Sequence, residues 1–187
     1  LAVGGSGRGE LHPHSDVDLL VLARDSKDMD EAALSQFFNQ LWDLGLILGY
    51  SVRTLAETLL DARQDVVLLT NLMEARWLAG DRALLNDLRQ GIAPTQMWPA
   101  AEYFKAKFAE QQQRHERYHD TAYNLEPNVK EGPGGLRDVQ MLTWVALRRF
   151  GEHPIRALLA HRFLTKAEER GLRASRDFLW RVRWGLH

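Results

Sequence analysis

The sequence contains no cysteine, which excludes disulfide bonds and thiol chemistry. It has no run of eighteen apolar residues, so no membrane-spanning helix is expected, and it shows no secretory signal. The net charge is −1, so the chain lacks the overall basic character of nucleic-acid-binding proteins. These absences favour a cytoplasmic protein that binds neither nucleic acid nor a membrane.

The residues that are present are those of an ordinary globular protein. Of the 187 residues, 45% are hydrophobic, which is enough for a substantial core. This length suits one domain or a domain with an extension. The sequence starts in a strand-like stretch and stops within a helical pattern, so we expect it to be a fragment of a longer protein.

The hydrophobic periodicity changes character near residue 55. Before that point it predicts strands at about 1–4, 17–23 and 46–53, and a helix from Met29 to Leu44. After it, helical patterns cover residues 55–63, 66–79, 82–90, 99–119, 136–150 and 165–186.

These patterns predict an α+β fold, with a small mixed β-sheet core followed by a C-terminal helical bundle. We expect the core at residues 1–64, truncated at its N-terminus, and the helical extension at residues 65–187, packed on the core. Gly45 is suited to end the first long helix. Thr54 and Glu57 have the spacing of a capping box at the start of the next helix.

A glycine-rich turn, Gly-Gly-Ser-Gly-Arg-Gly, occupies residues 4–9. Glycines such as Gly4 and Gly5 permit positive φ and close approach of a ligand, and successive backbone N–H groups can bind an anion. Ser6 adds a hydroxyl donor and Arg8 a planar cation suited to phosphate oxygens. We therefore expect these four residues to bind phosphates, although a loop of this kind taken alone is equally compatible with an ordinary tight turn.

Two aspartates, Asp16 and Asp18, stand at the start of the apolar stretch Leu19-Leu20-Val21-Leu22. Side chains two residues apart on a strand share a face, so both carboxylates point the same way. Two like charges this close are unfavourable unless a cation lies between them, and hard oxygen ligands suit Mg²⁺ or Mn²⁺. The alternative is a solvated strand entry in which Asp16 only caps the turn.

The turn and the aspartates together resemble the signature of the nucleotidyltransferase superfamily related to DNA polymerase beta. In that superfamily the carboxylates bind two metal ions, one activating the attacking oxygen and one holding the triphosphate. Other phosphate-binding motifs are excluded, because no Lys-Ser or Lys-Thr follows the glycines and no Gly-x-Gly-x-x-Gly lies between a strand and a long helix. The resemblance implies that Asp16 and Asp18 are the catalytic and metal-binding residues.

A second unusual stretch covers residues 123–138 and contains Asn-Leu-Glu-Pro-Asn-Val-Lys-Glu-Gly-Pro-Gly-Gly-Leu-Arg-Asp. It is longer than a connection between two helices requires. Lys130 and Arg137 carry charges suited to phosphates, and we predict that both bind the nucleotide. The alternative is a structural turn followed by a capped helix.

These two motifs and the intervening Gly-Tyr-Ser-Val-Arg-Thr together resemble the bacterial PII uridylyltransferase / uridylyl-removing enzyme family over essentially the whole chain. The resemblance implies transfer of UMP from UTP to a tyrosine of the nitrogen-signalling protein PII, with release of pyrophosphate. It also implies an HD phosphohydrolase domain and ACT domains elsewhere in a full-length, multifunctional chain. Alternatives are adenylyltransferase-type modification of another acceptor and a catalytically silent nucleotide-binding regulatory module.

The chain departs from the family pattern at three points. Ser6 stands where the family often has an aromatic residue, and Tyr50 where it usually has histidine. A third carboxylate is common on a later strand of superfamily members, yet residues 46–54 contain no acid. Asp65 and Glu74 are the candidates from the helices that follow, and the sequence does not choose between them.

The histidines are interpreted as structural or surface residues. His115 and His119 lie in a polar helical pattern, and no further metal-binding set accompanies them, so we expect both at the surface. His12 and His14 flank a proline beside the aspartates and are interpreted as turn residues, with contact of His14 to a nucleotide as the alternative.

Overall fold

The computed structural model describes residues 1–121, 128–151 and 153–186 and divides into two units, Leu1–Met97 and Trp98–His187. The sequence analysis placed the division after residue 64. The first unit extends beyond α3 (Leu55–Ala62) by two more helices, α4 (Val66–Met73) and α5 (Arg82–Gly91). They belong there because α3 packs on the strand before it, α4 on the N-terminal turn, and α5 on α3.

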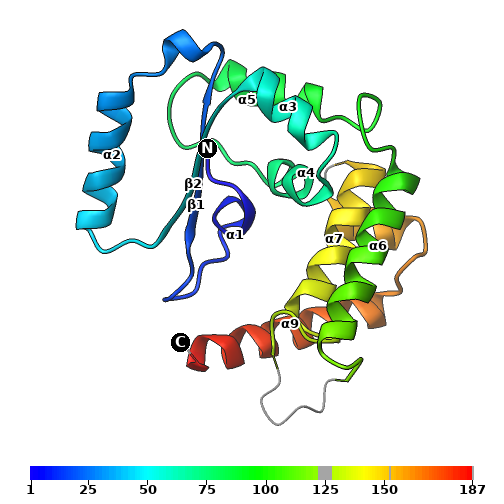
Figure 1. Cartoon of the computed structure of the whole chain (residues 1–187). Helices are drawn as coiled ribbons and strands as arrows, with labels where there is room; N and C mark the ends of the chain where they lie inside the picture. Colours follow the sequence, from blue (N-terminus) through cyan, green and yellow to red (C-terminus); the bar gives the residue numbers. More distant parts are fainter. Residues whose placement is uncertain (122–127, 152, 187) are drawn as a thin grey trace. The chain divides into compact units, whose positions relative to one another are not determined.

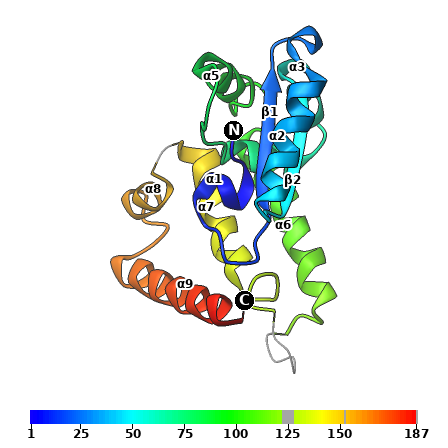
Figure 2. The ribbon, with the colours of Figure 1, turned by 90° about the vertical axis from the view of Figure 1, so that its left-hand side faces the viewer.

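The first unit is built on two parallel strands, β1 (Val17–Ala23) and β2 (Leu48–Thr54), which lie side by side in both ribbon views (Figure 1, Figure 2). Their register places Asp18 opposite Gly49. Ala2 forms isolated antiparallel bridges to Leu19 and to Arg76. The predicted α+β class with a small mixed sheet is therefore confirmed, although the predicted strand at 1–4 is reduced to these bridges.

The glycine-rich turn contains a short helix, α1 (Gly4–Arg8), which the sequence analysis interpreted only as a turn. Gly4 enters it with φ of 53°, and Gly9 leaves it with φ of 73°. Both values lie in the left-handed region that favours glycine. Two of the glycines thus provide the backbone turns at the two ends of one helical turn.

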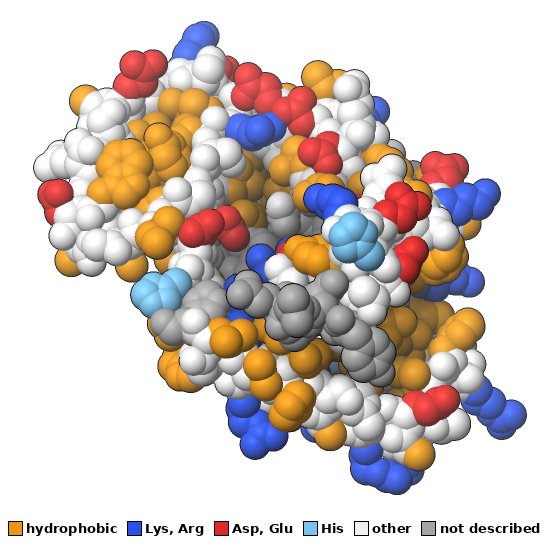
Figure 3. All heavy atoms as spheres, turned by 60° about the horizontal axis from the view of Figure 1, so that its bottom comes forward, with side chains coloured by type: hydrophobic (Ala, Val, Ile, Leu, Met, Phe, Trp, Pro, Cys, Tyr) orange, Lys and Arg blue, Asp and Glu red, His pale blue; other side chains and the backbone are white. Residues whose placement is uncertain are grey.

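Helix α2 (Glu31–Asp43) follows a short 3₁₀ turn and connects β1 to β2. Phe38 on α2 is buried, and its ring centroid lies 4.1 Å from that of Tyr50 on β2. Around this contact hydrophobic side chains reach the surface, as seen at the left of Figure 3; they include Phe37, Trp42, Leu44, Ile47 and Tyr50. Gly45 ends this region with φ of 78°, as predicted.

The helices that follow pack the rest of the first core. Thr54 and Glu57 form the predicted capping box at the start of α3. Among the buried side chains of these helices are Leu69 and Leu72 of α4 and Leu85 and Leu88 of α5, which join Leu20 of β1. Helix α4 ends at Met73, earlier than predicted, because the chain then extends and pairs with Ala2 through two backbone hydrogen bonds at Arg76, each of 2.9 Å.

The second unit is helical in the part that the structure describes. Helices α6 (Ala100–Arg117) and α7 (Leu136–Phe150) pack together, and α9 (Lys166–Leu186) contacts α7 (Figure 1). Helix α8 (Pro154–Ala160) was not predicted. Pro154 stands in the first turn of this helix, where a missing N–H costs nothing.

Charged side chains lie inside this helical unit. Lys107, Arg114 and Arg148 are almost completely buried, beside the aromatic residues Tyr103 and Trp144. A buried charge is costly unless it is paired, so each of these cations needs an acceptor. In the described residues, no helix is both long and apolar enough to cross a membrane.

Candidate nucleotide and metal site

The glycine-rich turn is hydrogen-bonded to β1 at Asp18. The backbone N–H of Asp18 donates to Ser6 Oγ over 2.8 Å, and the N–H of Val3 donates to the Asp18 carbonyl over 3.1 Å. Ser6 is only 3% exposed. Its hydroxyl therefore fixes the distance between the predicted phosphate-binding turn and the predicted metal-binding carboxylates.

The Asp18 carboxylate lies between two glycines. A Cβ built on Gly4 would be 3.1 Å from Asp18 Oδ2, and a Cβ built on Gly49 would be 2.7 Å from Asp18 Oδ1. The second distance is too short for any real side chain, so only glycine at position 49 leaves this carboxylate in place. Asp16 precedes β1 and is exposed. The predicted pair thus combines one enclosed and one exposed carboxylate.

Neither candidate for a third carboxylate joins this pair. Asp65 caps α4, where its side chain accepts from the N–H groups of Val67 and Leu68. Glu74 is buried beside the turn and is ion-paired to Arg8. Within the described part of the chain, no group of three histidine, aspartate or glutamate side chains is placed to hold a metal ion.

The residues present nevertheless fit a divalent cation of the Mg²⁺ type. Mg²⁺ is usually held by one or two carboxylates together with substrate phosphates and water. Asp16 and Asp18 supply the carboxylates, and the space left by the missing Cβ of Gly4 and Gly49 adjoins the Asp18 oxygens. Asp16 and Asp18 would hold the cation, which would neutralise phosphate charge.

Charged side chains stabilise the glycine-rich turn; Arg8, Glu10, Glu74 and Arg76 form this charged frame. Arg8 Nη1 lies 2.5 Å from Glu74 Oε2, and Arg8 Nε lies 2.9 Å from Glu10 Oε2. Burial lowers the pKa of Arg8, but the hydrogen bonds and charges of Glu74 and Glu10 outweigh this and raise it. Arg8 therefore has a structural role, because it links the turn to Glu74. Its predicted contact with the phosphates of a nucleotide stays a prediction.

Arg76 completes this frame. Its guanidinium donates to the carbonyls of Ser6, over 3.0 Å, and Gly7, over 3.3 Å. Gly7 packs so closely against the backbone that an added Cβ would be 2.3 Å from the Glu74 carbonyl oxygen. Arg76 was not among the predicted site residues. The available signal was its place in the sequence, two residues after the candidate acid Glu74.

The other predicted nucleotide contacts, Lys130 and Arg137, lie in the second unit. Both face Glu131, at 3.7 Å from Lys130 Nζ and 3.0 Å from Arg137 Nη2. The amides of the first turn of α7 are also occupied, because those of Leu136 and Arg137 donate to loop carbonyls. The binding of a nucleotide by Lys130 and Arg137 stays a prediction; part of this motif, residues 123–127, lies outside the described residues.

Asp138 organises the described end of this loop. Its carboxylate accepts from Gln111 over 2.8 Å, from the Gly134 N–H over 2.8 Å, and from Arg114. His115 Nε2 lies 3.0 Å from the same carboxylate. The His115 side chain is 23% exposed, so it is not wholly at the surface as predicted but partly covered beside a carboxylate 23 positions away in the sequence.

The other three histidines with predicted positions are His12, His14 and His119, of which one is buried and two are exposed. His119 is exposed, as predicted, and follows the end of α6. His12 is buried in the turn before the aspartates, and its backbone N–H donates to Ser15 Oγ over 3.0 Å. His14 is exposed. These positions agree with turn residues at 12 and 14.

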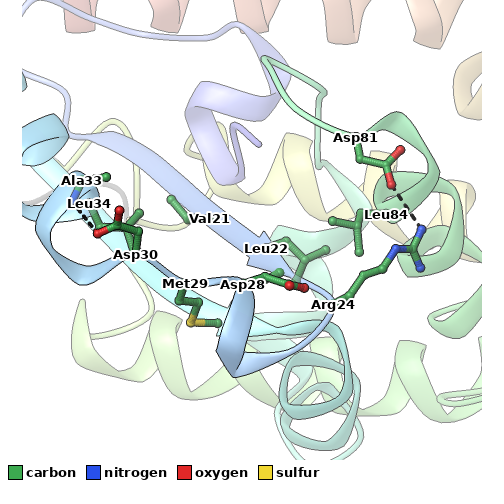
Figure 4. A pocket seen from close by; sticks show the side chains of 11 residues that line it. Val21, Leu22, Arg24, Asp28, Met29, Asp30, Ala33, Leu34, Asp81 and Leu84 are labelled. Atoms are coloured by element: carbon green, nitrogen blue, oxygen red, sulfur yellow. Dashed lines mark hydrogen bonds and ion pairs between the residues drawn. The ribbon is translucent and has the colours of Figure 1, made fainter.

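A pocket of the first unit is lined by the last residues of β1 together with residues of α2 and α5 (Figure 4). Its wall is mostly apolar and includes Val21, Leu22, Met29, Leu34 and Leu84. Its charged groups have structural roles: Asp30 caps α2, and Arg24 is ion-paired to Asp81 at 3.2 Å. The charged residues of this pocket serve helix caps and an ion pair, so the chemistry of the chain points to the turn and the aspartates.

Comparisons with known proteins identify a family for each part of the chain. Residues 1–77 match the model of the nucleotidyltransferase domain family, and residues 102–187 match that of the GlnD PII-uridylyltransferase family. The two matches fall in the two structural units. No solved structure matches the chain significantly.

Curated relatives match over the whole chain. A bifunctional uridylyltransferase/uridylyl-removing enzyme of Nitrosococcus oceani is 52% identical over 188 residues, which cover 100% of this chain and 21% of the relative. Enzymes of the same name from Methylococcus capsulatus and Pseudomonas putida are 51% and 50% identical, with the same coverage. The chain spans about a fifth of the length of these relatives. By its sequence it belongs to the family of bifunctional uridylyltransferase/uridylyl-removing enzymes.

Proposed function

We propose that this chain carries the uridylyl-transfer site of such an enzyme and transfers UMP from UTP to a tyrosine hydroxyl of the PII protein, in nitrogen regulation. The observation that carries the proposal is the hydrogen bond between Ser6 Oγ and the Asp18 N–H, which couples a phosphate-binding type of turn to a pair of carboxylates. The relatives named uridylyltransferase support the choice of nucleotide.

In the proposed reaction, the tyrosine oxygen attacks the α-phosphorus of UTP. The bond from that phosphorus to the oxygen bridging to the β-phosphate breaks, pyrophosphate leaves, and the hydroxyl proton passes to water. A bound Mg²⁺ or Mn²⁺ would lower the charge repulsion between the phosphates and the attacking oxygen. The protein contributes positioning and fixed charges, which can supply much of the rate.

Each part of the site has a distinct task in this scheme. The glycine-rich turn offers its backbone to the triphosphate, with Gly4 and Gly5 leaving room for close approach. Asp16 and Asp18 hold the cation. Ser6, hydrogen-bonded to the Asp18 N–H, keeps Asp18 next to the turn, so the phosphates and the cation would be held close to each other. Lys130 and Arg137 are assigned to the nucleotide by their charge alone.

The test is a transfer assay with two nucleotides and two acceptors. The protein is incubated with Mg²⁺ and α-labelled UTP or ATP, together with PII or glutamine synthetase. We expect label only on PII and only from UTP, and no label on a PII variant whose acceptor tyrosine is replaced by phenylalanine. Label from ATP on another acceptor would replace the proposal by an adenylyltransferase.

A catalytically silent nucleotide-binding module is the second possibility from the sequence. It predicts UTP binding by calorimetry without any labelled product, even with Mg²⁺ and PII present. Asp18→Asn separates the two further. An active enzyme loses turnover in this variant, whereas a silent module has no turnover to lose.

A further inference from the structure

The side chain of Asn71 faces the same small space as the Asp18 carboxylate. Asn71 is half-buried on α4, the helix that packs on α1. A Cβ built on Gly4 would lie 3.1 Å from Asp18 Oδ2 and 3.5 Å from Asn71 Oδ1. Two oxygens from different elements therefore converge beside Gly4, which is buried.

This convergence has a chemical meaning. A carboxylate oxygen and an amide oxygen are both hydrogen-bond acceptors, so they gain nothing from facing one space unless a donor or a cation occupies it. Carboxylates and the carbonyl oxygens of asparagine are both ligands of hard divalent cations. An amide is also neutral, so it adds an oxygen beside Asp18 without the repulsion that another carboxylate would bring.

We propose that Asn71 Oδ1 is a third protein ligand of the divalent cation held by Asp16 and Asp18. The inference rests on the proposed metal-dependent transfer. It also accounts for the absence of a third acid. On β2 the residue opposite Asp18 is Gly49, which has no side chain. Asp65 and Glu74 are occupied in a helix cap and in an ion pair. The third oxygen comes from α4 instead of the neighbouring strand.

The test measures binding of Mn²⁺ alone, without nucleotide, from the loss of the free-ion signal in electron paramagnetic resonance. Asn71→Leu keeps the approximate volume and removes the oxygen, so Mn²⁺ binding should weaken about tenfold, the lower end of the range for groups that support metal ligands. Asn71→Asp adds a charge and should tighten binding. Asn86→Leu, an exposed asparagine of the helix α5, is the matched control and should bind like wild type.

The outcomes separate this inference from the proposed function. If Asp18→Asn abolishes Mn²⁺ binding while Asn71→Leu leaves it unchanged, Asn71 is not a ligand and the transfer site stands. If Asn71→Asp weakens binding as much as Asn71→Leu, the amide orients Asp18 through its N–H and the inference is wrong. If wild type neither binds Mn²⁺ nor transfers UMP, both proposals fail. Asn71→Ala, which also removes the oxygen and is smaller, replaces the leucine variant if thermal melting shows that the latter is unfolded.

Discussion

Arg8 of the glycine-rich turn and Glu74 at the end of α4 form a buried ion pair, with 2.5 Å between Nη1 and Oε2. The Glu74 side chain is 5% exposed and the Arg8 side chain 19%, so both charges are largely removed from water. Such a pair is costly to break, because the remaining charge is left without its partner. The pair fixes the turn to a helix 66 positions away in the sequence.

Glu74→Gln should therefore loosen the turn without removing any group from the catalytic carboxylates. We expect a loss of about 2 kcal/mol in the free energy of unfolding, typical of a hydrogen bond to a charged group. The KM for UTP should rise more than kcat falls, because the turn is the proposed binding element for the triphosphate. Urea unfolding and steady-state kinetics measure the two effects. Glu10→Gln, which neutralises the more exposed partner of Arg8, should lower the free energy of unfolding by less. An equal loss in the two variants would contradict the structural role of the buried Arg8–Glu74 pair.

Gly49→Ala tests the space beside Asp18. The added Cβ would lie 2.7 Å from Asp18 Oδ1, so the carboxylate must move. Because small displacements at a reacting centre can cost about a hundredfold in rate, we expect a loss of that order in kcat for UMP transfer. Gly171→Ala in α9 is the control, since nothing lies within 4 Å of its Cβ. It should leave transfer intact and stabilise the helix by about 0.5–1 kcal/mol.

Asp16→Asn and Asp18→Asn preserve shape and remove charge. Each should reduce transfer by about a thousandfold, the upper range for the loss of one electrostatic contact at a transition state. The fold should persist, because the hydrogen bond to Ser6 comes from the backbone of Asp18. Turnover assays and thermal melting by circular dichroism measure the two properties. Transfer at the wild-type rate in either variant would refute the metal assignment.

The strands and long helices could be predicted because local patterns dominate them. The predicted strand at 17–23 agrees with β1, and the predicted helix at 136–150 agrees with α7. The capping box of Thr54 is a local signal of the same kind. The early end of α4 could not be predicted, because it depends on pairing between Arg76 and Ala2, which are far apart in the sequence.

The site could be predicted only to the level of its motifs. The sequence indicated Ser6 and Asp18, but not that the Ser6 hydroxyl accepts from the Asp18 backbone. It offered Glu74 as a metal ligand, whereas the structure pairs this acid with Arg8. Asn71 carries no charge and belongs to no motif, so only its three-dimensional place beside Gly4 draws attention to it.

Asp138→Asn should weaken the second unit, and the effect should depend on pH. Burial raises the pKa of Asp138, but hydrogen bonds from Gln111, Arg114, Gly134 and His115 outweigh it and lower the pKa. A lowered folded-state pKa means that the unfolded state binds more protons at acid pH. The stabilisation by Asp138 is therefore present above the ordinary aspartate pKa, about 3.9, and is lost as the pH falls through the folded value.

For this variant we expect a loss of about 2 kcal/mol at neutral pH, as for a hydrogen-bonded charge, and a smaller difference from wild type below about pH 3. Urea unfolding at several pH values measures it. Asp177→Asn, an exposed aspartate paired only with its neighbour Arg176, is the control and should change little. A pH-independent difference for Asp138→Asn would contradict the role of its charge.

Lys107 and Glu110 form an ion pair in which we expect replacement of the two residues to have opposite effects on stability. The Lys107 side chain is 4% exposed, and its Nζ lies 2.5 Å from Glu110 Oε2 and 4.7 Å from the centre of the Trp144 ring. Burial lowers the pKa of Lys107, Glu110 opposes this, and the nearby charges of Arg137 and Arg114 add to the lowering. The charged form is thus held in the interior at a cost.

Lys107→Met replaces the buried charge by an apolar chain of similar length, so stability at neutral pH should be unchanged or about 1 kcal/mol higher. Glu110→Gln leaves the buried ammonium with a weaker partner and should cost about 1–2 kcal/mol. Because the pKa of Lys107 is lowered, the unfolded state binds more protons at alkaline pH, and this cost should shrink as the pH rises toward 10. Urea unfolding of both variants at pH 7 and near pH 10 measures these effects. A large loss of stability in Lys107→Met would show instead that the ammonium is required for the packing of α6 on α7.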